Sequence, residues 1–111
     1  VYSLEYIATH PAYLGAPDPK MRLATVARLI GIEGGATDEA IHRLLDRIDE
    51  LKEEIGEPLT LESAGISKGQ MDEALDQLVA LAEKDVNMYS SPCECKSDAL
   101  QGLFMRMWTG R

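Results

Sequence analysis

The chain has 111 residues, 45% of them hydrophobic, and this length and composition suit one folded domain and exclude a disordered chain. Its 19 acidic residues outnumber its 11 basic residues, which gives a net charge of −8. This charge repels phosphate backbones and anionic lipids, so we expect neither a nucleic acid nor a membrane as a partner.

The N-terminal part is expected to contain a short helix followed by a longer one. Residues 3–14 favour a short helix or turn that Pro11 interrupts. Asp18 followed by Pro19 is typical of a helix start, because the carboxylate can cap the first turn and proline lacks only an N–H that has no partner there. We expect this helix to end at Gly31. Its predicted inner face consists of Leu23, Val26, Ala27 and Ile30.

The longest predicted helix begins after Thr37 and extends to residue 55. Thr37 is expected to cap its start, and Gly56 is placed to end it. Asp38 and His42 lie four residues apart and are positioned to pair on its surface. Its polar positions are mostly charged, which predicts a solvated face. The predicted inner stripe consists of Ile41, Leu44, Leu45, Ile48, Leu51 and Ile55.

The stretch GEPLTLESAGIS at 56–67 separates two predicted helices. Pro58 cannot continue the first helix, and Thr60 can cap a short turn that Gly65 ends. Ser67 and Gln70 match a capping box and predict the start of a second long helix. The predicted inner face of this helix consists of Met71, Ala74, Leu75, Leu78, Leu81 and Ala82.

Residues 87–96 are interpreted as a loop, and Ser97 as the cap of a last helix. Apolar residues recur at spacings of three and four rather than two, which is typical of helices. The sequence therefore predicts an all-α fold, a helical bundle of four to five amphipathic helices in a single domain over residues 1–111. The residues of the last helix that are expected to face inward are Leu100, Leu103, Phe104 and Met107.

The sequence contains no complete set of catalytic or metal-binding residues. His10 and His42 lie far apart, and neither has a second histidine at helical spacing. Cys93 and Cys95 are too close in sequence for a stapling disulfide, so we interpret them as free thiols of a cytoplasmic protein. We assign no catalytic residue, no metal ligand and no cofactor-binding residue in this chain.

A series of short sequence features runs in order over residues 19–108. The features are Ala27 to Gly31, Ile55-Gly56-Glu57-Pro58, Leu61 with Gly65-Ile66, Asp85, Ser91-Pro92, and Trp108. This order resembles the C-terminal helical domain of the iron-containing (group III) alcohol dehydrogenases. The phrase I-G-x-P-x-x-L-x-x-x-G-I is its most specific part, because backbone geometry determines where proline and glycine fit. Glu57 stands where the family has an apolar residue, and Ser91 where it has asparagine.

The resemblance implies a fragment of a metal-dependent, NAD(P)-linked alcohol dehydrogenase, an oxidoreductase that transfers hydride between an alcohol and a carbonyl compound. It implies a divalent metal, iron or zinc, held by one aspartate and three histidines, and a missing N-terminal domain that binds the nicotinamide. On this interpretation the chain supplies one wall of the active-site cleft, holds neither metal nor NAD(P), and is inactive alone. His10 is then an ordinary helix or turn residue. In the family the loop between the last two helices lies closest to the substrate, which makes Asn87, Ser90 and Ser91 the substrate-cleft candidates.

Two further interpretations stay open. The first is a standalone acidic helical module that binds a protein partner through an exposed apolar groove and has no catalytic activity. The second is a small redox or metal protein that uses Cys93 and Cys95. A domain cut from an enzyme is expected to expose an apolar patch where its missing half packed, and such a patch would also favour a homodimer.

Overall fold

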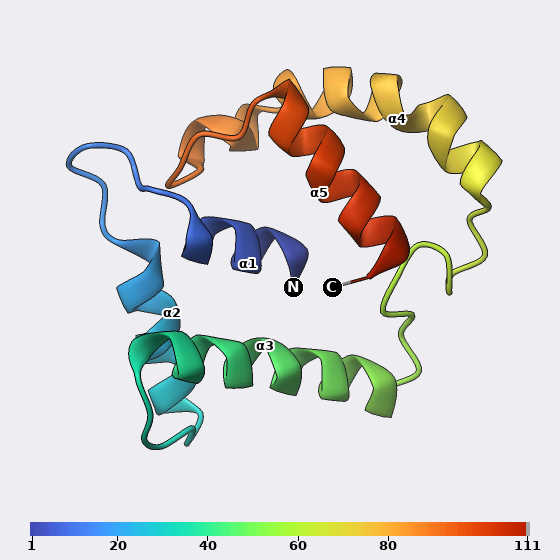
Figure 1. The fold of residues 1–111 in the computed structure, drawn as a ribbon. Helices are drawn as coiled ribbons and strands as arrows, with labels where there is room; N and C mark the ends of the chain where they lie inside the picture. Colours follow the sequence, from blue (N-terminus) through green and yellow to red (C-terminus); the bar gives the residue numbers. More distant parts are fainter. Residues whose placement is uncertain (111) are drawn as a thin grey trace. The chain divides into compact units, whose positions relative to one another are not determined.

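The computed structural model describes residues 1–110, and these residues are mainly helical (Figure 1). In chain order the helices are α1 (Tyr2–Thr9), α2 (Pro19–Leu29), α3 (Thr37–Glu54), α4 (Lys68–Glu83) and α5 (Ser97–Thr109), with a 3-10 helix, η1 (Val86–Ser90), before α5. Residues 1–110 contain no strand, only an isolated antiparallel bridge between Ala12 and Cys93. The predicted all-α class is therefore confirmed. Within the described chain, no helix combines the length and apolarity that crossing a membrane requires.

Contacts among the described residues divide the chain into two compact units. The first unit contains residues 3–57, together with Val1 and residues 92–94. The second unit contains residues 58–91 and the chain from Cys95 onward, together with Tyr2. The expected single domain over residues 1–111 stays a prediction, and each unit is described here by itself.

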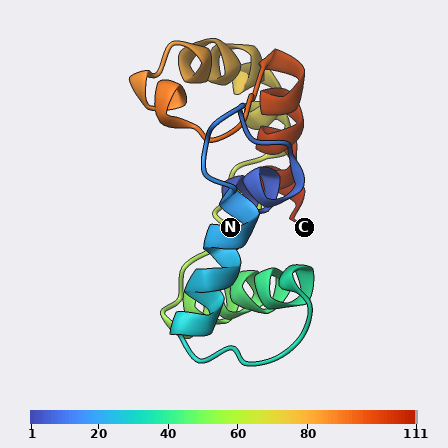
Figure 2. The same cartoon turned by 90° about the vertical axis from the view of Figure 1, so that its left-hand side faces the viewer.

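The first unit is built on the packing of α2 against α3, which cross each other in Figure 1 and Figure 2. Asp18 accepts a hydrogen bond from the backbone N of Lys20 at 2.9 Å, which confirms the predicted start of α2. Ala24 and Ala27 on α2 are completely buried, and their small side chains let the two helices approach closely. The buried core of this unit consists of Leu23, Ala24, Ala27, Ala40, Ile41, Leu44 and Leu45.

The predicted inner faces of α2 and α3 are only partly correct. On α2, Val26 and Ile30 were expected inside but are 45% and 54% exposed, because this helix turns its alanine side toward α3. On α3, Leu51 and Ile55 near the C-terminal end are 48% and 66% exposed. α2 has 11 residues and α3 has 18. The shorter helix crosses the N-terminal half of the longer one, so it covers only part of the apolar stripe.

The short helix α1 completes the first unit. It ends at Thr9, two residues before Pro11, in agreement with the predicted interruption. Its apolar side packs against the core of α2 and α3 through Leu4, Ile7 and Ala8. A separate stretch, residues 92–94, joins this unit through main-chain groups, since the N–H of Tyr13 donates to Pro92 O at 2.9 Å.

The second unit is built on the packing of α4 against α5. Met71 and Val79 of α4 and Leu100 of α5 are buried. Val79 was not predicted to be inside, whereas Leu81, which was, is 59% exposed. The error follows from a small rotation of the buried face of α4, since positions 79 and 81 lie on different sides of a helix.

Helix starts were predicted with mixed success. The capping box of Ser67 and Gln70 is confirmed, because both reciprocal hydrogen bonds are present. The predicted caps Thr37 and Ser97 are wrong, since both are the first residues of their helices and the N-cap positions are Ala36 and Lys96. The Ser97 hydroxyl instead donates to the Glu83 carboxylate on α4. The expected loop over residues 87–96 is also wrong in part, because its beginning belongs to the 3-10 helix η1.

The connector at 56–67 has a defined conformation and is bound to α5. Gly56 and Gly65 have φ values of 77° and 93°, the left-handed region that glycine adopts without steric cost. The N–H of Leu61 donates to Met107 O at 2.9 Å. The Trp108 indole Nε1–H donates to the carbonyl oxygen of Ile66, immediately before α4, at 2.8 Å. The connector therefore ends α3 and fixes the start of α4 against the last turns of α5.

Candidate functional site

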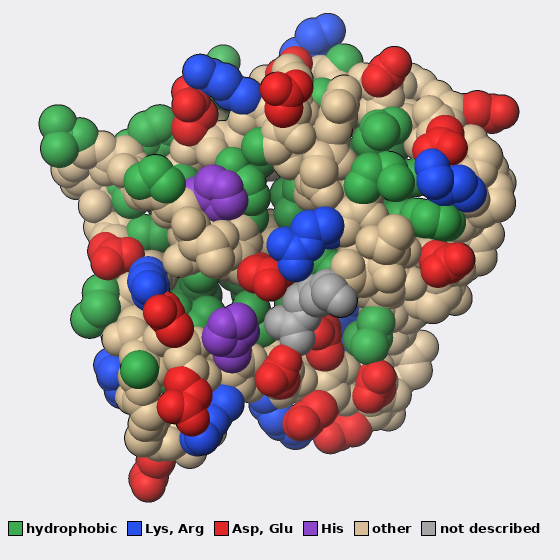
Figure 3. Space-filling model, in the orientation of Figure 1, with side chains coloured by type: hydrophobic (Ala, Val, Ile, Leu, Met, Phe, Trp, Pro, Cys, Tyr) green, Lys and Arg blue, Asp and Glu red, His purple; other side chains and the backbone are tan. Residues whose placement is uncertain are grey.

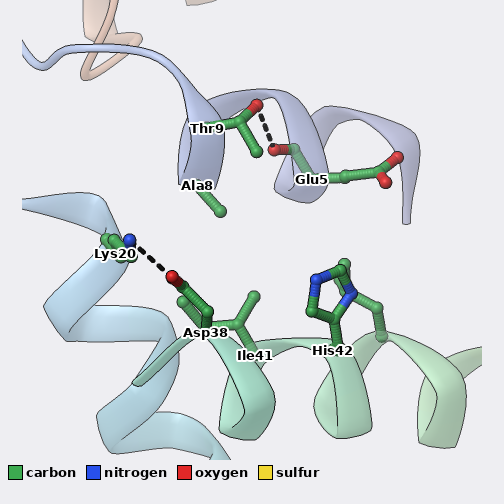
Figure 4. Close-up of a pocket in the computed structure, with 8 residues that line it drawn as sticks. Glu5, Ala8, Thr9, Lys20, Asp38, Ile41 and His42 are labelled. Atoms are coloured by element: carbon green, nitrogen blue, oxygen red, sulfur yellow. Dashed lines mark hydrogen bonds and ion pairs between the residues drawn. The ribbon is translucent and has the colours of Figure 1, made fainter. Parts of the chain in front are cut away.

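A hollow in the first unit lies between α1 and the start of α3 (Figure 4). Its volume is about 370 Å³, within the range of small-ligand sites. In Figure 4, Ala8 points into it from α1, and Ile41 and His42 point into it from α3. The full lining consists of Glu5, Ala8, Thr9, Lys20, Asp38, Ile41, His42 and Leu45. We call this hollow the α1–α3 cavity.

The floor of the α1–α3 cavity is apolar, and its rim is charged. Ile41 and Leu45 are 5% and 1% exposed, so the floor is part of the packed core. At the rim, the Lys20 ammonium pairs with the Asp38 carboxylate at 2.5 Å. This ion pair ties the beginning of α2 to the beginning of α3. Both side chains are substantially exposed, so the pair contributes little to stability.

The other polar side chains of the lining are Glu5, Thr9 and His42. Thr9 donates its hydroxyl hydrogen to carbonyl oxygens of its own helix, at 3.0 Å from Glu5 O, which leaves the hydroxyl oxygen able to accept. The expected pairing of Asp38 with His42 is wrong, because Asp38 pairs with Lys20 instead. The His42 imidazole therefore faces the cavity with ring nitrogens available to a ligand.

The residues predicted to line a substrate cleft lie together in and just after η1. Asn87 is fixed by Asp85, whose carboxylate accepts from the Asn87 backbone N at 2.8 Å and from its side-chain amide at 2.9 Å. The Ser90 hydroxyl donates to Asn87 O at 2.8 Å. Ser91 is the residue that ends the 3-10 helix. These hydrogen bonds hold a compact turn, and the role of Asn87, Ser90 and Ser91 toward a substrate stays a prediction.

The described residues do not form a ligand set for a metal ion. Within residues 1–110, no group of three or more histidine, cysteine, aspartate or glutamate side chains is placed to hold one. His10 ends α1, with its Nδ1 2.8 Å from Tyr6 O and its ring stacked on Tyr6 at a centroid distance of 3.7 Å. Cys93 and Cys95 form no disulfide among the described residues, and Cys93 is buried. The divalent metal implied by the family resemblance therefore finds no fitting site in this part of the chain.

A groove in the second unit is lined almost entirely by apolar side chains. It runs between α4 and α5, includes the connector, and has a volume of about 420 Å³. Among the described residues, Gln70 is the only polar side chain in the lining, and its side-chain oxygen is already bound within the capping box. The apolar lining consists of Leu61, Ile66, Met71, Ala74, Leu78, Phe104 and Met107. We call this surface the α4–α5 groove.

The surface charges alternate in sign and form no continuous basic patch on the face shown in Figure 3. On α3, Arg47 pairs with Glu54 at 2.9 Å and with Glu50 at 3.2 Å. The hydrogen bond that Arg47 donates to the Glu54 carboxylate is the main cause that raises the pKa of Arg47 above its ordinary value, and Glu50 adds to it. These pairs are exposed and match the solvated face predicted for this helix.

Neither the α1–α3 cavity nor the α4–α5 groove was predicted from the sequence. Glu5, Lys20 and Asp38 come from three helices and lie in one rim only because the helices pack as they do. The α4–α5 groove had a weak signal, since its apolar α4 residues belong to the predicted inner face. Comparison with known proteins adds no assignment: no protein-family model matches the chain, and no curated protein matches it significantly.

Proposed function

We propose that this chain is the C-terminal helical domain of an alcohol dehydrogenase of the iron-containing (group III) type. The connector carries the proposal. Its glycines and proline, together with Leu61 and Ile66, are the most specific residues of the resemblance. In the structure, Gly56 and Gly65 are left-handed, and the backbone of Leu61 and Ile66 is hydrogen-bonded to α5. The two left-handed glycines have a backbone role that few other residues would satisfy, and this supports a family signature over a chance pattern.

The proposed activity belongs to the complete protein. The nicotinamide and the divalent metal, iron or zinc, would be held by a domain and by ligands outside this chain. This chain would contribute one wall of the cleft, with Asn87, Ser90 and Ser91 as the nearest residues to substrate. The turn around Asp85 supports that assignment, because it gives these side chains a defined position on the surface. The proposal also includes a cytoplasmic location, in line with the two free thiols.

The test is to express the complete reading frame that contains this chain. We expect an N-terminal nicotinamide-binding domain, alcohol-dependent reduction of NAD or NADP, and loss of that activity on chelation with recovery on adding iron(II) or zinc. The 111-residue chain alone serves as the matched control and should show no turnover. A complete protein without a nucleotide-binding domain, or one that is inactive with a broad panel of alcohols and both metals, would refute the proposal.

The alternative function is an interaction module without catalysis, and the α4–α5 groove is the observation that favours it. An apolar groove between two helices is a common binding site for the apolar face of a partner helix. The same experiment separates the two functions. If the complete protein contains the dehydrogenase domain, the groove is covered or used within that enzyme, and if it does not, the interaction module becomes the better interpretation. With either function, we propose that an exposed apolar patch lets the chain form a homodimer, and the dimer fraction should rise with protein concentration.

A further inference from the structure

The α4–α5 groove has an uncharged lining. Charged residues make up 27% of the chain, yet none of the described side chains that line this groove is charged. The side-chain oxygen of Gln70, its one polar side chain, accepts hydrogen bonds from the backbone N and the hydroxyl of Ser67. A charged occupant would lose its water here without gaining an opposite charge, and that loss is costly. The groove therefore favours an uncharged occupant.

The groove is confined to the end of the second unit where the connector lies. On α4 it covers residues 70–78, a length of about 12 Å, and on α5 it is lined by Phe104 and Met107. Leu61 and Ile66 of the connector also belong to the lining. The backbone N of Leu61 donates to Met107 O at 2.9 Å, which holds the connector against α5. The connector limits the length of an occupant at this end, and this favours a compact molecule over a partner helix that extends beyond the groove.

The side chains of the groove suit an aromatic ring. Met71 and Met107 carry polarisable thioether sulfur atoms, which make favourable contacts with ring edges. Phe104 offers a ring that can pack edge to face with another. Ala74 has a small side chain that leaves room between these larger ones. The volume of about 420 Å³ lies within the range of small-ligand sites.

We propose that the α4–α5 groove binds small uncharged aromatic molecules. The ring lies over Ala74 and Leu78 of α4, with its edge toward the methionine sulfur atoms. Removal of the ring and of the apolar lining from water supplies the affinity. The substrate-cleft candidates do not line the groove, so this inference is independent of the proposed dehydrogenase function.

2-Acetylnaphthalene is the probe, and 2-naphthoate and 2-naphthylmethylammonium are ligands of similar shape that carry a negative and a positive charge at about pH 7.5. Each is titrated into the isotope-labelled chain and followed by amide chemical shifts. We expect 2-acetylnaphthalene to shift the amides of Ala74, Leu78, Phe104 and Met107, and to bind about tenfold more tightly than either charged ligand. Equal or tighter binding of a charged ligand would overturn the proposal. So would the absence of 2-acetylnaphthalene binding, or shifts confined to the α1–α3 cavity.

Two variants of α4 locate the site. Ala74→Leu adds three carbon atoms inside the groove and should weaken 2-acetylnaphthalene binding about fivefold or more. Ala80→Leu makes the same change at an exposed position of α4 outside the lining, and it should leave binding unchanged. Equal weakening in both variants would refute the site. The comparison of the three ligands on the unaltered chain decides the question if Ala74→Leu fails to fold.

Two other occupants of the groove would give different results in the same spectra. If these amides shift when the chain alone is concentrated, a second copy of the chain occupies the groove, and the proposal is overturned. If an amphipathic helical peptide of leucine and lysine shifts them while 2-acetylnaphthalene does not, the groove binds a protein helix. That result would also overturn the proposal and would favour the interaction module.

Discussion

Leu45 gives the most direct test of the core of the first unit. Its side chain is 1% exposed and belongs to the buried cluster formed by α2 and α3. Leu45→Ala removes three carbon atoms from that cluster. Ala24 and Ala27 of α2 belong to the same cluster, and their short side chains cannot extend to fill the space.

The expected loss of unfolding free energy is about 3 kcal/mol, within the range of about 2–5 kcal/mol for buried leucines. The value lies in the lower half of that range because Leu45 also lines the α1–α3 cavity. Truncation there enlarges a hollow that already opens to water rather than creating a sealed void. A loss of this size is a large part of a total stability of about 5–15 kcal/mol.

Urea unfolding followed by circular dichroism measures this loss. Leu29→Ala is the matched control, because it is the same chemical change at a position on α2 that is 80% exposed, and it should change stability by less than about 0.5 kcal/mol. We expect the midpoint of Leu45→Ala to fall by about 1–3 M urea with little change in slope. If the two variants lose equal stability, the packing of α2 on α3 described here is wrong.

Three further predictions concern the connector and the thiols. Gly65→Ala should lower stability by about 1–2 kcal/mol because the φ of Gly65 is 93°. Gly69→Ala, inside α4 with open space around it, should raise stability by about 0.5–1 kcal/mol. If urea unfolding shows that both variants change stability in the same direction, the backbone argument is contradicted. Ser67→Ala should cost about 1 kcal/mol through loss of the capping box, and an unchanged melting temperature would count against that role. Cys95 should react with iodoacetamide in the native state and Cys93 only after addition of denaturant, as read by peptide mass; early labelling of buried Cys93 would contradict its burial.

The start and stop signals were the most reliable part of the sequence interpretation. Asp18 with Pro19, Gly56, and Ser67 with Gln70 each act as predicted, because their effects depend on atoms only a few residues away. Thr37 and Ser97 failed as caps for a related reason. Both are good capping residues, but each helix begins one residue earlier than predicted, and local chemistry alone does not resolve a shift of that size.

The inner faces were less predictable than the helix ends. Helical spacing placed Val26 with Leu23 and Leu51 with Leu44, and each pair does lie on one side of its helix. Which part of that side is buried depends on where the partner helix crosses. α2 covers only the N-terminal half of α3, so Leu51 lies beyond the contact.

The sequence by itself determined the all-α class, the approximate positions of the helices and the left-handed glycines of the connector, because these depend on the periodicity of apolar residues and on local backbone geometry. Only the tertiary structure decided the crossing of α2 and α3, the division of contacts into two units, and the two hollows. Those features depend on contacts between residues far apart in the chain, such as Lys20 with Asp38 and Leu61 with Met107. Such contacts follow from how whole helix surfaces fit together, and the spacing of residues along one helix does not contain that information.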